Sequence, residues 1–220
     1  MTEKSLKMVN LDCTTLGEAW FRCIRELFES GYRYIISSGS FAGGERIEFD
    51  FITIRISKPG IRPLIPDVPH GLPQPTTMQY IEEEYLPYFM ADHKEPNEQY
   101  TYGMYVGPQI PKVIEKYKKG GFENNQACMT IGDKNSIDLE DPPCLRLIDT
   151  RVRYGKLHFV VYFRSWDLWG GFPSNLAAIQ LMKEDMAKEL DVEDGEMIAV
   201  SKGLHLYGHH LELAKMVLRM

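Results

Sequence analysis

The sequence has few cysteines, and their spacing excludes the commonest cross-linked scaffolds. Its four cysteines are widely scattered and form no Cys-x-x-Cys pair: Cys13, Cys23, Cys128 and Cys144. This distribution indicates reduced thiols, as in the cytoplasm, rather than a disulfide framework or a zinc site. The adjacent His209 and His210 do not suggest a metal either, because neighbours on a helix point in different directions. We therefore expect a cytoplasmic protein without a metal.

Long apolar runs and an excess of positive charge are absent too. No segment approaches the roughly 20 apolar residues that a membrane-spanning helix needs. Residues 1–12 lack the apolar stretch of a signal peptide. With 25 basic and 31 acidic residues the net charge is -6, which gives no electrostatic attraction to nucleic acid. We expect neither a membrane nor a nucleic acid as a partner.

What remains is the composition of an ordinary globular domain. The chain has 220 residues, of which 44% are hydrophobic and 25% charged, enough for one sizeable core. Amphipathic helical patterns are interspersed with short β-type runs, without an internal repeat. The sequence therefore predicts a single α+β domain over residues 1–220, with a large mixed β-sheet and several packed helices.

Three stretches of the N-terminal part carry specific expectations. Thr15 and Glu18 form a capping box for an amphipathic helix. Residues 46–57 read as one long strand whose apolar phase shifts near Phe51, which predicts a β-bulge there. Residues 58–75 contain six prolines and two glycines, which predicts a long irregular surface loop rather than an interdomain linker.

Further helices and a short strand precede the second half. A helix is predicted to begin at Thr76, with Gln79 completing its cap, and Pro87 is expected to interrupt or kink it. A second amphipathic helix is predicted over residues 110–120, where two glycines end it. A short strand over residues 127–131 then leads to the segment that carries the chemistry.

That segment reads as a β-hairpin. Residues 145–153 and 156–164 both alternate in polarity and are rich in β-branched and aromatic residues. Tyr154-Gly155 between them predicts a two-residue turn, because glycine readily adopts a positive φ. Arg153 then pairs with Lys156.

At the open end of this hairpin lies the stretch Asp141-Pro142-Pro143-Cys144. In the predicted register Leu145 faces Arg164, and Cys144 lies opposite Ser165. The prolines cannot donate ladder hydrogen bonds and end the strand just before the thiol. A cation beside a thiol stabilises its thiolate, so Cys144 is a candidate nucleophile rather than an inert apolar residue.

Four short motifs follow one another in this half of the chain. They are Pro142-Pro143-Cys144, Arg164-Ser165-Trp166-Asp167, Gly171-Phe172-Pro173-Ser174-Asn175 and His205-Leu206-Tyr207. In order and spacing they closely resemble thymidylate synthases, over about residues 128–210, and four motifs in register are a specific signal. The short chain with a diverged N-terminal half resembles the archaeal-type branch. The resemblance implies a methyltransferase that makes dTMP from dUMP, with 5,10-methylenetetrahydrofolate or a related reduced pterin as donor.

The resemblance assigns the nucleophile to Cys144. Carbon 5 of uracil reacts poorly with a one-carbon donor, and addition of a thiolate at carbon 6 converts the ring into a reactive enolate. By the same resemblance, Arg164 holds the nucleotide phosphate and lowers the pKa of the cysteine, and Ser165 adds a phosphate hydrogen bond. The bland alternative for Arg164 is a solvated charge at the hairpin end.

Base recognition is assigned to Asn175 and Asp167. The Asn175 amide both donates and accepts, which suits the N–H and carbonyl of uracil, although a helix N-cap is its common structural role. The related deoxycytidylate hydroxymethylases carry an aspartate there, so asparagine favours dUMP over dCMP. Asp167 is expected to take part in catalysis and to contact the base through its backbone; a carboxylate that caps a loop is the alternative.

The remaining substrate contacts come from His205, Tyr207 and Tyr102. The resemblance implies that His205 and Tyr207 hydrogen-bond the deoxyribose hydroxyl, and that Tyr102 lies near the reacting carbon. A structural histidine and an ordinary core or surface aromatic are the alternatives.

A general acid–base is assigned to the run Glu82-Glu83-Glu84. In a regular helix Glu84 lies between Tyr80 and Tyr88, which predicts partial burial. Burial raises a carboxyl pKa toward neutrality, as proton transfer requires. Glu84 is therefore the expected acid–base, and Glu82 and Glu83 the solvated face.

The chain also departs from the family's pattern. Asn124-Asn125 occupies the place of an arginine pair that reaches the phosphate of a partner subunit, so a monomer is compatible with the sequence. Arg46 is the only suggested counterpart of an N-terminal phosphate arginine, and Leu145 replaces the usual histidine after the cysteine. The C-terminal segment that closes over the folate has no counterpart before Met220. These departures suggest a modified pterin as the donor.

Three other functions remain open on the sequence. Hydroxymethylation of dUMP or dCMP would use the same nucleophile with water completing the reaction. A deoxynucleotide-binding protein without catalysis would explain the missing arginines. A cysteine hydrolase would need His205 or His209 within hydrogen-bonding reach of the Cys144 sulfur.

Overall fold

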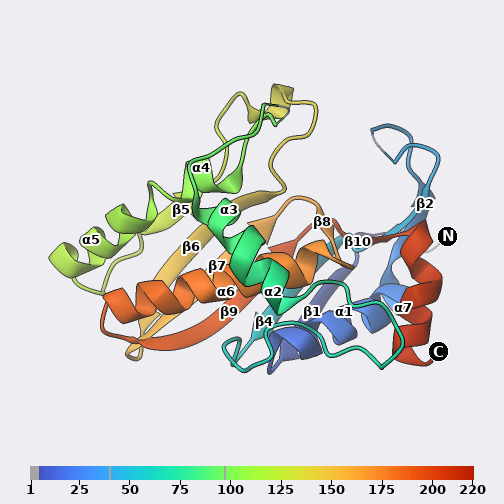
Figure 1. Cartoon of the computed structure of the whole chain (residues 1–220), viewed down its shortest axis with the longest axis horizontal. Helices are drawn as coiled ribbons and strands as arrows, with labels where there is room; N and C mark the ends of the chain where they lie inside the picture. Colours follow the sequence, from blue (N-terminus) through green and yellow to red (C-terminus); the bar gives the residue numbers. More distant parts are fainter. Residues whose placement is uncertain (1–4, 40, 97) are drawn as a thin grey trace.

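The computed structural model describes residues 5–39, 41–96 and 98–220, and the strands of this part of the chain form two sheets (Figure 1). The larger sheet has the order β1-β4-β9-β7-β6-β5 and the smaller one the order β2-β3-β10-β8. The strands are β1 (Met8–Cys13), β2 (Tyr32–Ile35), β3 (Glu45–Glu48), β4 (Phe51–Ile56), β5 (Cys128–Thr130), β6 (Leu145–Arg153), β7 (Lys156–Phe163), β8 (Trp166–Asp167), β9 (Glu193–Ser201) and β10 (Leu204–Tyr207). Parallel pairs (β1 with β4, β7 with β9) and antiparallel pairs (β4 with β9, β6 with β7) occur in one sheet. The predicted α+β fold with a large mixed sheet is confirmed.

Two helices, α1 (Leu16–Ser30) and α6 (Gly171–Glu189), cover one face of the larger sheet (Figure 1). Helix α1 begins at the predicted cap, where the Thr15 hydroxyl accepts a hydrogen bond from the Glu18 N–H at 3.1 Å. Helix α6 is buried on most of its circumference, which is typical of a helix enclosed by other elements. It therefore forms the centre of the packing beneath the sheet.

The other helical segments surround these two. They are α2 (Met78–Tyr80), the π-helical turn η1 (Ile81–Tyr85), α3 (Leu86–Met90), α4 (Tyr102–Val106), α5 (Ile110–Gly120), the short 3-10 turns η2 (Ser136–Asp138) and η3 (Gly208–His210), and α7 (Leu211–Leu218). Within the described ranges, no helix is long and apolar enough to cross a bilayer. Buried apolar side chains from Leu11 to Val217 form one core cluster, and on that basis we propose that the chain is a single domain.

The long strand predicted over residues 46–57 is in fact two strands in different sheets. Strand β3 pairs with β2 and β10 in the smaller sheet, whereas β4 pairs with β1 and β9 in the larger one. The shift in apolar phase near Phe51 therefore marks the crossing of the chain from one sheet to the other, not a β-bulge. Between the strands, Phe49 is buried and its N–H donates to the Leu204 carbonyl at 3.0 Å.

The helix that carries the glutamate run continues through Pro87 instead of breaking there. Its cap is Thr77, not Thr76, with the hydroxyl accepting from the Tyr80 N–H at 3.1 Å. A proline ring in a regular helix would clash with the carbonyl four residues earlier. Here the preceding turn is widened, with the Leu86 N–H donating to the Ile81 carbonyl. This π turn removes the conflict and rotates the side chains that follow it.

The predicted hairpin is confirmed at its turn. Tyr154 and Gly155 both have positive φ values, 54° and 71°, as a two-residue turn with matching twist requires. Arg153 pairs with Lys156. Upstream, α5 ends at Gly120 with Gly121 at φ 76°, as the glycine pair predicts. The irregular loop predicted over residues 58–75 contains neither helix nor strand.

The close approach of α3 and α4 yields a stability prediction at Gly103. A Cβ at this position would lie 1.9 Å from the Ala91 carbonyl oxygen, so Gly103→Ala must displace the backbone. We expect it to lower the free energy of unfolding in urea by at least about 1–3 kcal/mol. Gly120→Ala is the matched control, because nothing lies within 4 Å of its added Cβ and alanine favours a helix by about 0.5–1 kcal/mol. Equal stability of the two variants would contradict this packing.

Candidate active site

The open end of the β6–β7 hairpin joins Cys144 to Arg164. The Arg164 N–H donates to the Cys144 carbonyl at 2.8 Å. The pairing is one residue away from the predicted register, because a bulge between Leu145 and Leu147 inserts an extra residue into β6. Leu145 consequently faces Phe163, and Arg164, not Ser165, lies opposite the cysteine. A bulge at this point bends the strand and aims the side chains at its end.

The Arg164 guanidinium is held by the segment before the cysteine. Its Nε donates to the Pro143 carbonyl at 3.3 Å, and its Nη2 donates to the Asp141 carboxylate at 3.2 Å and to the Pro142 carbonyl. The prolines therefore supply acceptors for the arginine as well as ending the strand. The side chain is 31% exposed, so the guanidinium keeps one side open to a ligand. Ser165, the next residue, is half-buried.

The Cys144 thiol is half-buried, and its pKa is raised from the ordinary value of 9.0. Burial is the largest cause; Arg164 lowers the pKa, but by less, and Asp141 raises it. Arg164 therefore lowers the thiol pKa as expected, but the net shift is upward because burial has the larger effect. Desolvation outweighs one arginine whose charge is shared with a carboxylate.

Two tyrosines line the thiol. The Tyr102 hydroxyl accepts a hydrogen bond from the Leu145 N–H at 3.3 Å, which places it beside Cys144. Its pKa is raised by burial first and by Cys144 second. The pKa of Tyr100, which belongs to none of the four motifs, is raised for the same two reasons. Both phenols are therefore protonated near neutral pH and act as hydrogen-bond donors.

Asn175 lies inside helix α6 and is not its N-cap. Helix α6 begins at Gly171, four residues before Asn175. Asn175 is buried, with 8% of its surface exposed. Its Oδ1 accepts from the Trp166 indole N–H at 2.8 Å, and its Nδ2 donates to the Tyr85 hydroxyl. Asn175, the residue predicted to read the base, is thus hydrogen-bonded to Trp166 and Tyr85, for which the sequence predicted no such role.

Asp167 caps the start of helix α6. Its carboxylate accepts from the N–H groups of Gly170 and Gly171, both at 2.9 Å, and from that of Trp169 at 3.2 Å. The Asp167 side chain therefore has the capping role that was the alternative to a catalytic one. Negative charge at a helix N-terminus is favourable. A contact between the backbone of Asp167 and the base stays a prediction.

His205 presents an unpaired acceptor. Its Nδ1 lies 2.8 Å from the Gly203 carbonyl, so Nδ1 carries the proton and donates. Burial, and then Arg46, lowers the pKa of His205 to about 4, so the ring is neutral. Its Nε2 is buried without a hydrogen-bond partner among the described residues. A ligand hydroxyl is a group that this lone pair can accept from.

Arg46, near this histidine, supplies a second positive charge in addition to Arg164. Its guanidinium donates to the hydroxyls of Tyr34 and Tyr207, both at 3.2 Å, and pairs with Glu48 at 3.6 Å. It is close enough to lower the pKa values of both His205 and Cys144. Because the Tyr207 hydroxyl accepts from Arg46, its own proton is free to donate.

Glu84 is exposed on the surface of the π turn. The glutamates of the run are exposed, including Glu84, so its predicted partial burial is wrong. The i±4 argument assumes a regular helix, whereas residues 81–85 form a π turn, in which each residue rotates less about the axis. Tyr85 faces inward instead. Asn124, in the place of the family's first arginine, forms a local turn by donating to the Gly121 carbonyl at 3.1 Å.

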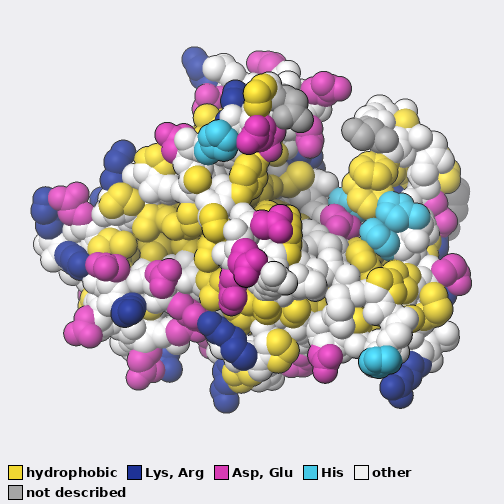
Figure 2. Space-filling view, viewed as in Figure 1, with side chains coloured by type: hydrophobic (Ala, Val, Ile, Leu, Met, Phe, Trp, Pro, Cys, Tyr) yellow, Lys and Arg dark blue, Asp and Glu magenta, His cyan; other side chains and the backbone are white. Residues whose placement is uncertain are grey.

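The space-filling view shows one hollowed face of the molecule. Figure 2 shows a notch between a projection at the top and a lobe on the right, with histidines gathered on the lobe. Aromatic rings stack at the end of β10: Phe41 on Tyr207, with centroids 4.2 Å apart, and Tyr207 on His209, at 5.7 Å. No cluster of three or more His, Cys, Asp or Glu suited to a metal occurs in the described ranges.

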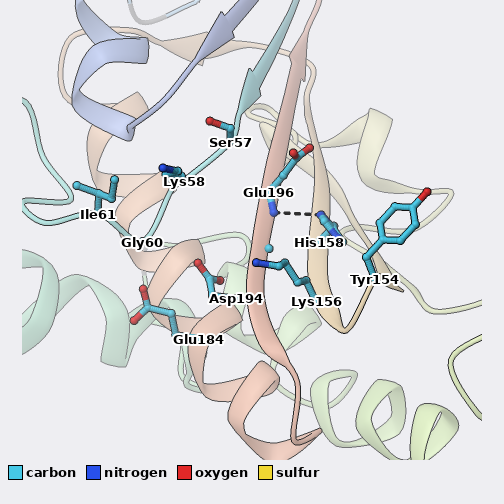
Figure 3. A pocket seen from close by; sticks show the side chains of 11 residues that line it. Ser57, Lys58, Gly60, Ile61, Tyr154, Lys156, His158, Glu184, Asp194 and Glu196 are labelled. Atoms are coloured by element: carbon cyan, nitrogen blue, oxygen red, sulfur yellow. Dashed lines mark hydrogen bonds between the residues drawn. The ribbon is translucent and has the colours of Figure 1, made fainter.

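A hollow of about 650 Å³ lies elsewhere, at the turn end of the hairpin (Figure 3). Its lining includes Lys58, Lys156, Glu184 and Asp194, and His158 is fixed there because its Nδ1 accepts from the Glu196 N–H at 3.0 Å. None of the predicted site residues lines it. The hollow is therefore separate from the candidate active site.

The raised thiol pKa gives a testable pH dependence. Only the thiolate is alkylated, so we expect the rate of Cys144 alkylation by iodoacetamide to reach half its maximum above pH 9.0. Asp141→Asn removes a charge that raises the pKa and should move this midpoint down, whereas Arg164→Gln should move it up. Alkylation is followed by mass spectrometry in a Cys128→Ser background, because Cys128 is exposed. A wild-type midpoint below pH 9.0 would refute the dominance of burial.

Comparison with known proteins agrees with this geometry. The thymidylate synthase family model matches residues 97–220. A Methanosarcina barkeri protein named provisionally as a thymidylate synthase is 24% identical over 211 residues, 93% of this chain and 92% of its own length. Its Methanosarcina acetivorans counterpart is 28% identical over 62% of this chain and 66% of its own length. A Listeria monocytogenes thymidylate synthase is 39% identical over 49% of this chain and 34% of its own length. The family model covers more than half of the chain, and the chain belongs to the thymidylate synthase family.

Proposed function

We propose that this protein converts dUMP to dTMP by transferring one carbon to carbon 5 of the uracil ring. The observation that carries the proposal is the 2.8 Å hydrogen bond that holds Cys144 beside Arg164 in a member of this family. A thiol next to a partly open guanidinium offers a nucleophile and a phosphate-binding cation in one place.

The polar groups around the thiol fit the parts of a deoxynucleotide. Arg164 and Ser165, with Arg46 as a second cation, bind the phosphate. The unpaired Nε2 of His205 accepts from the sugar hydroxyl, and the free proton of Tyr207 donates to it. Asn175 reads the base edge.

The chemistry begins when the Cys144 thiolate adds to carbon 6 of uracil and the ring becomes an enolate. Carbon 5 then attacks the donor's one-carbon group, and loss of the carbon 5 proton breaks the bond between that carbon and the donor nitrogen, which leaves an exocyclic methylene on the ring. For dTMP a hydride from the reduced donor adds to this methylene, and the Cys144 sulfur leaves as carbons 5 and 6 regain their double bond. The hydroxyls of Tyr102 and Tyr100, both half-buried and both within electrostatic reach of Cys144, can donate hydrogen bonds that stabilise charge on the ring as it develops.

The acid–base role of Glu84 stays a prediction. Its carboxylate is exposed. Tyr85, one residue later, already points inward.

A reduced folate or related pterin is the proposed donor. Tyr80, 42% exposed, stacks on Tyr85 with ring centroids 6.0 Å apart. This pair presents a flat aromatic surface beside the base-reading amide, which fits a pterin ring. Which pterin binds stays a prediction, as do the monomeric state and the cytoplasmic location.

Of the alternatives, hydroxymethylation remains the second candidate, because it uses the same nucleophile and base contacts. A cysteine hydrolase is disfavoured: among the described residues no histidine is hydrogen-bonded to the Cys144 sulfur, and His205 Nδ1 is engaged by Gly203. A binding protein without catalysis is distinguished by experiment.

The proposal predicts exchange at carbon 5 of the substrate. With dUMP tritiated at carbon 5 and a reduced folate, the wild-type protein should release tritium to water. Cys144→Ala should reduce the release to background, because no enolate forms without the thiolate. Cys128→Ala, which removes an exposed thiol on β5, should keep it. Tight dUMP binding without tritium release would leave the binding protein as the function.

A further inference from the structure

Asparagine alone cannot distinguish uracil from cytosine. The two bases present opposite patterns at the edge formed by positions 3 and 4: uracil offers an N–H and a carbonyl, and cytosine a bare nitrogen and an amino group. An amide that turns by half a rotation exchanges its donor and acceptor ends and fits either base. Discrimination by Asn175 therefore needs something that prevents this rotation.

Trp166 meets that need. Its indole N–H donates to Asn175 Oδ1 at 2.8 Å, and an indole N–H can only donate. Rotation of the amide would turn the Nδ2 donor toward this donor and leave both unpaired in a buried place, which is costly. The ring cannot move aside, because it is 2% exposed, stacks on Phe163 with centroids 3.9 Å apart, and packs on Phe172 at 4.6 Å.

Tyr85 occupies the other end of the amide but does not orient it. Its hydroxyl accepts from Asn175 Nδ2, and a hydroxyl that turns can instead donate to an oxygen. Tyr85 would therefore satisfy either orientation of the amide. The two contacts look alike, but only the one with Trp166 has a fixed direction.

We propose that Trp166 is a specificity-determining residue that locks the Asn175 amide in the orientation that reads uracil and rejects cytosine. With Trp166 bonded to Oδ1 and Tyr85 to Nδ2, the amide still has one lone pair on Oδ1 and one proton on Nδ2 that are free to bond with the base. These match the N–H and the carbonyl of uracil and oppose both groups of cytosine. This inference rests on the proposed binding of dUMP at Asn175.

The test is calorimetric titration of the protein with dUMP and with dCMP, comparing the ratio of the two dissociation constants. Wild type should prefer dUMP. Trp166→Phe frees the amide, so the preference should fall by at least about tenfold, mainly because dCMP binds more tightly. Tyr85→Phe also removes one hydrogen bond from Asn175, but the lock stays, so the ratio should change by less than about threefold.

Trp20→Phe controls for loss of a buried indole. Trp20 is fully buried and donates to the Leu168 carbonyl at 2.8 Å, away from Asn175, so the ratio should not change. If Trp166→Phe fails to fold, as judged by its thermal transition, Trp166→His replaces it. An imidazole can donate or accept, and the same fall in preference is expected.

The outcomes separate this inference from the proposed function. An unchanged ratio in a folded Trp166 variant that still binds dUMP would overturn the lock and leave the proposed function intact. An equal fall in Tyr85→Phe would overturn the assignment of the lock to Trp166. Wild-type protein that binds neither nucleotide would overturn both the proposed function and the inference built on it.

Discussion

The hydrogen bond between the Cys144 carbonyl and the Arg164 N–H fixes the geometry on which the site depends. It closes the bulged end of the hairpin, and the chain then runs directly into β8. There Asp167 pairs beside His205 and caps helix α6, the helix that carries Asn175. A short path of backbone thus sets Cys144, Arg164, His205 and Asn175, the residues of the proposed site, relative to one another. Because these contacts are backbone hydrogen bonds and a helix cap, little backbone entropy remains to be lost when a ligand binds.

The site is prepared for a ligand by polar groups whose pairing is incomplete. His205 is neutral and buried, with one nitrogen unpaired, and buried polar atoms without partners are costly in a folded protein. The Arg164 guanidinium donates to a proline carbonyl and to the exposed Asp141 carboxylate. A bound phosphate can replace these groups as the hydrogen-bond acceptor. The raised pKa of the Cys144 thiol reflects the burial of this site, because removal from water disfavours the thiolate. Selectivity rests on the direction of one indole hydrogen bond.

The sequence predicted the turns, caps and helix ends that depend on the backbone preferences of neighbouring residues. The turn at Tyr154-Gly155, the cap at Thr15 and the helix end at Gly121 all follow from backbone preferences of a few residues. The bulge in β6 could not be predicted, because the hairpin arms alone allow the regular register. The crossing near Phe51 between two sheets looked like a phase shift in one strand, since sequence periodicity cannot show which sheet a strand joins.

The functional residues divide in the same way. The motif resemblance predicted roles for Cys144 and Asn175 but did not predict which side chains contact them. Glu84 was misplaced because a π turn, which relieves the conflict at Pro87, changes which side chain faces inward. Trp166 lies within the Arg164-Ser165-Trp166-Asp167 motif, yet only its hydrogen bond to the Asn175 amide suggests a role for it. Tertiary contacts of this kind leave no periodic signal in the sequence.

A crystal structure of the protein with dUMP bound tests the central claim most directly. The account predicts the phosphate on Arg164, the sugar hydroxyl on His205 Nε2, and carbon 6 of the base beside the Cys144 sulfur, with Arg164 released from Asp141. Binding of dUMP instead in the hollow lined by Lys58, Lys156 and His158, or with its base remote from Cys144, would contradict it.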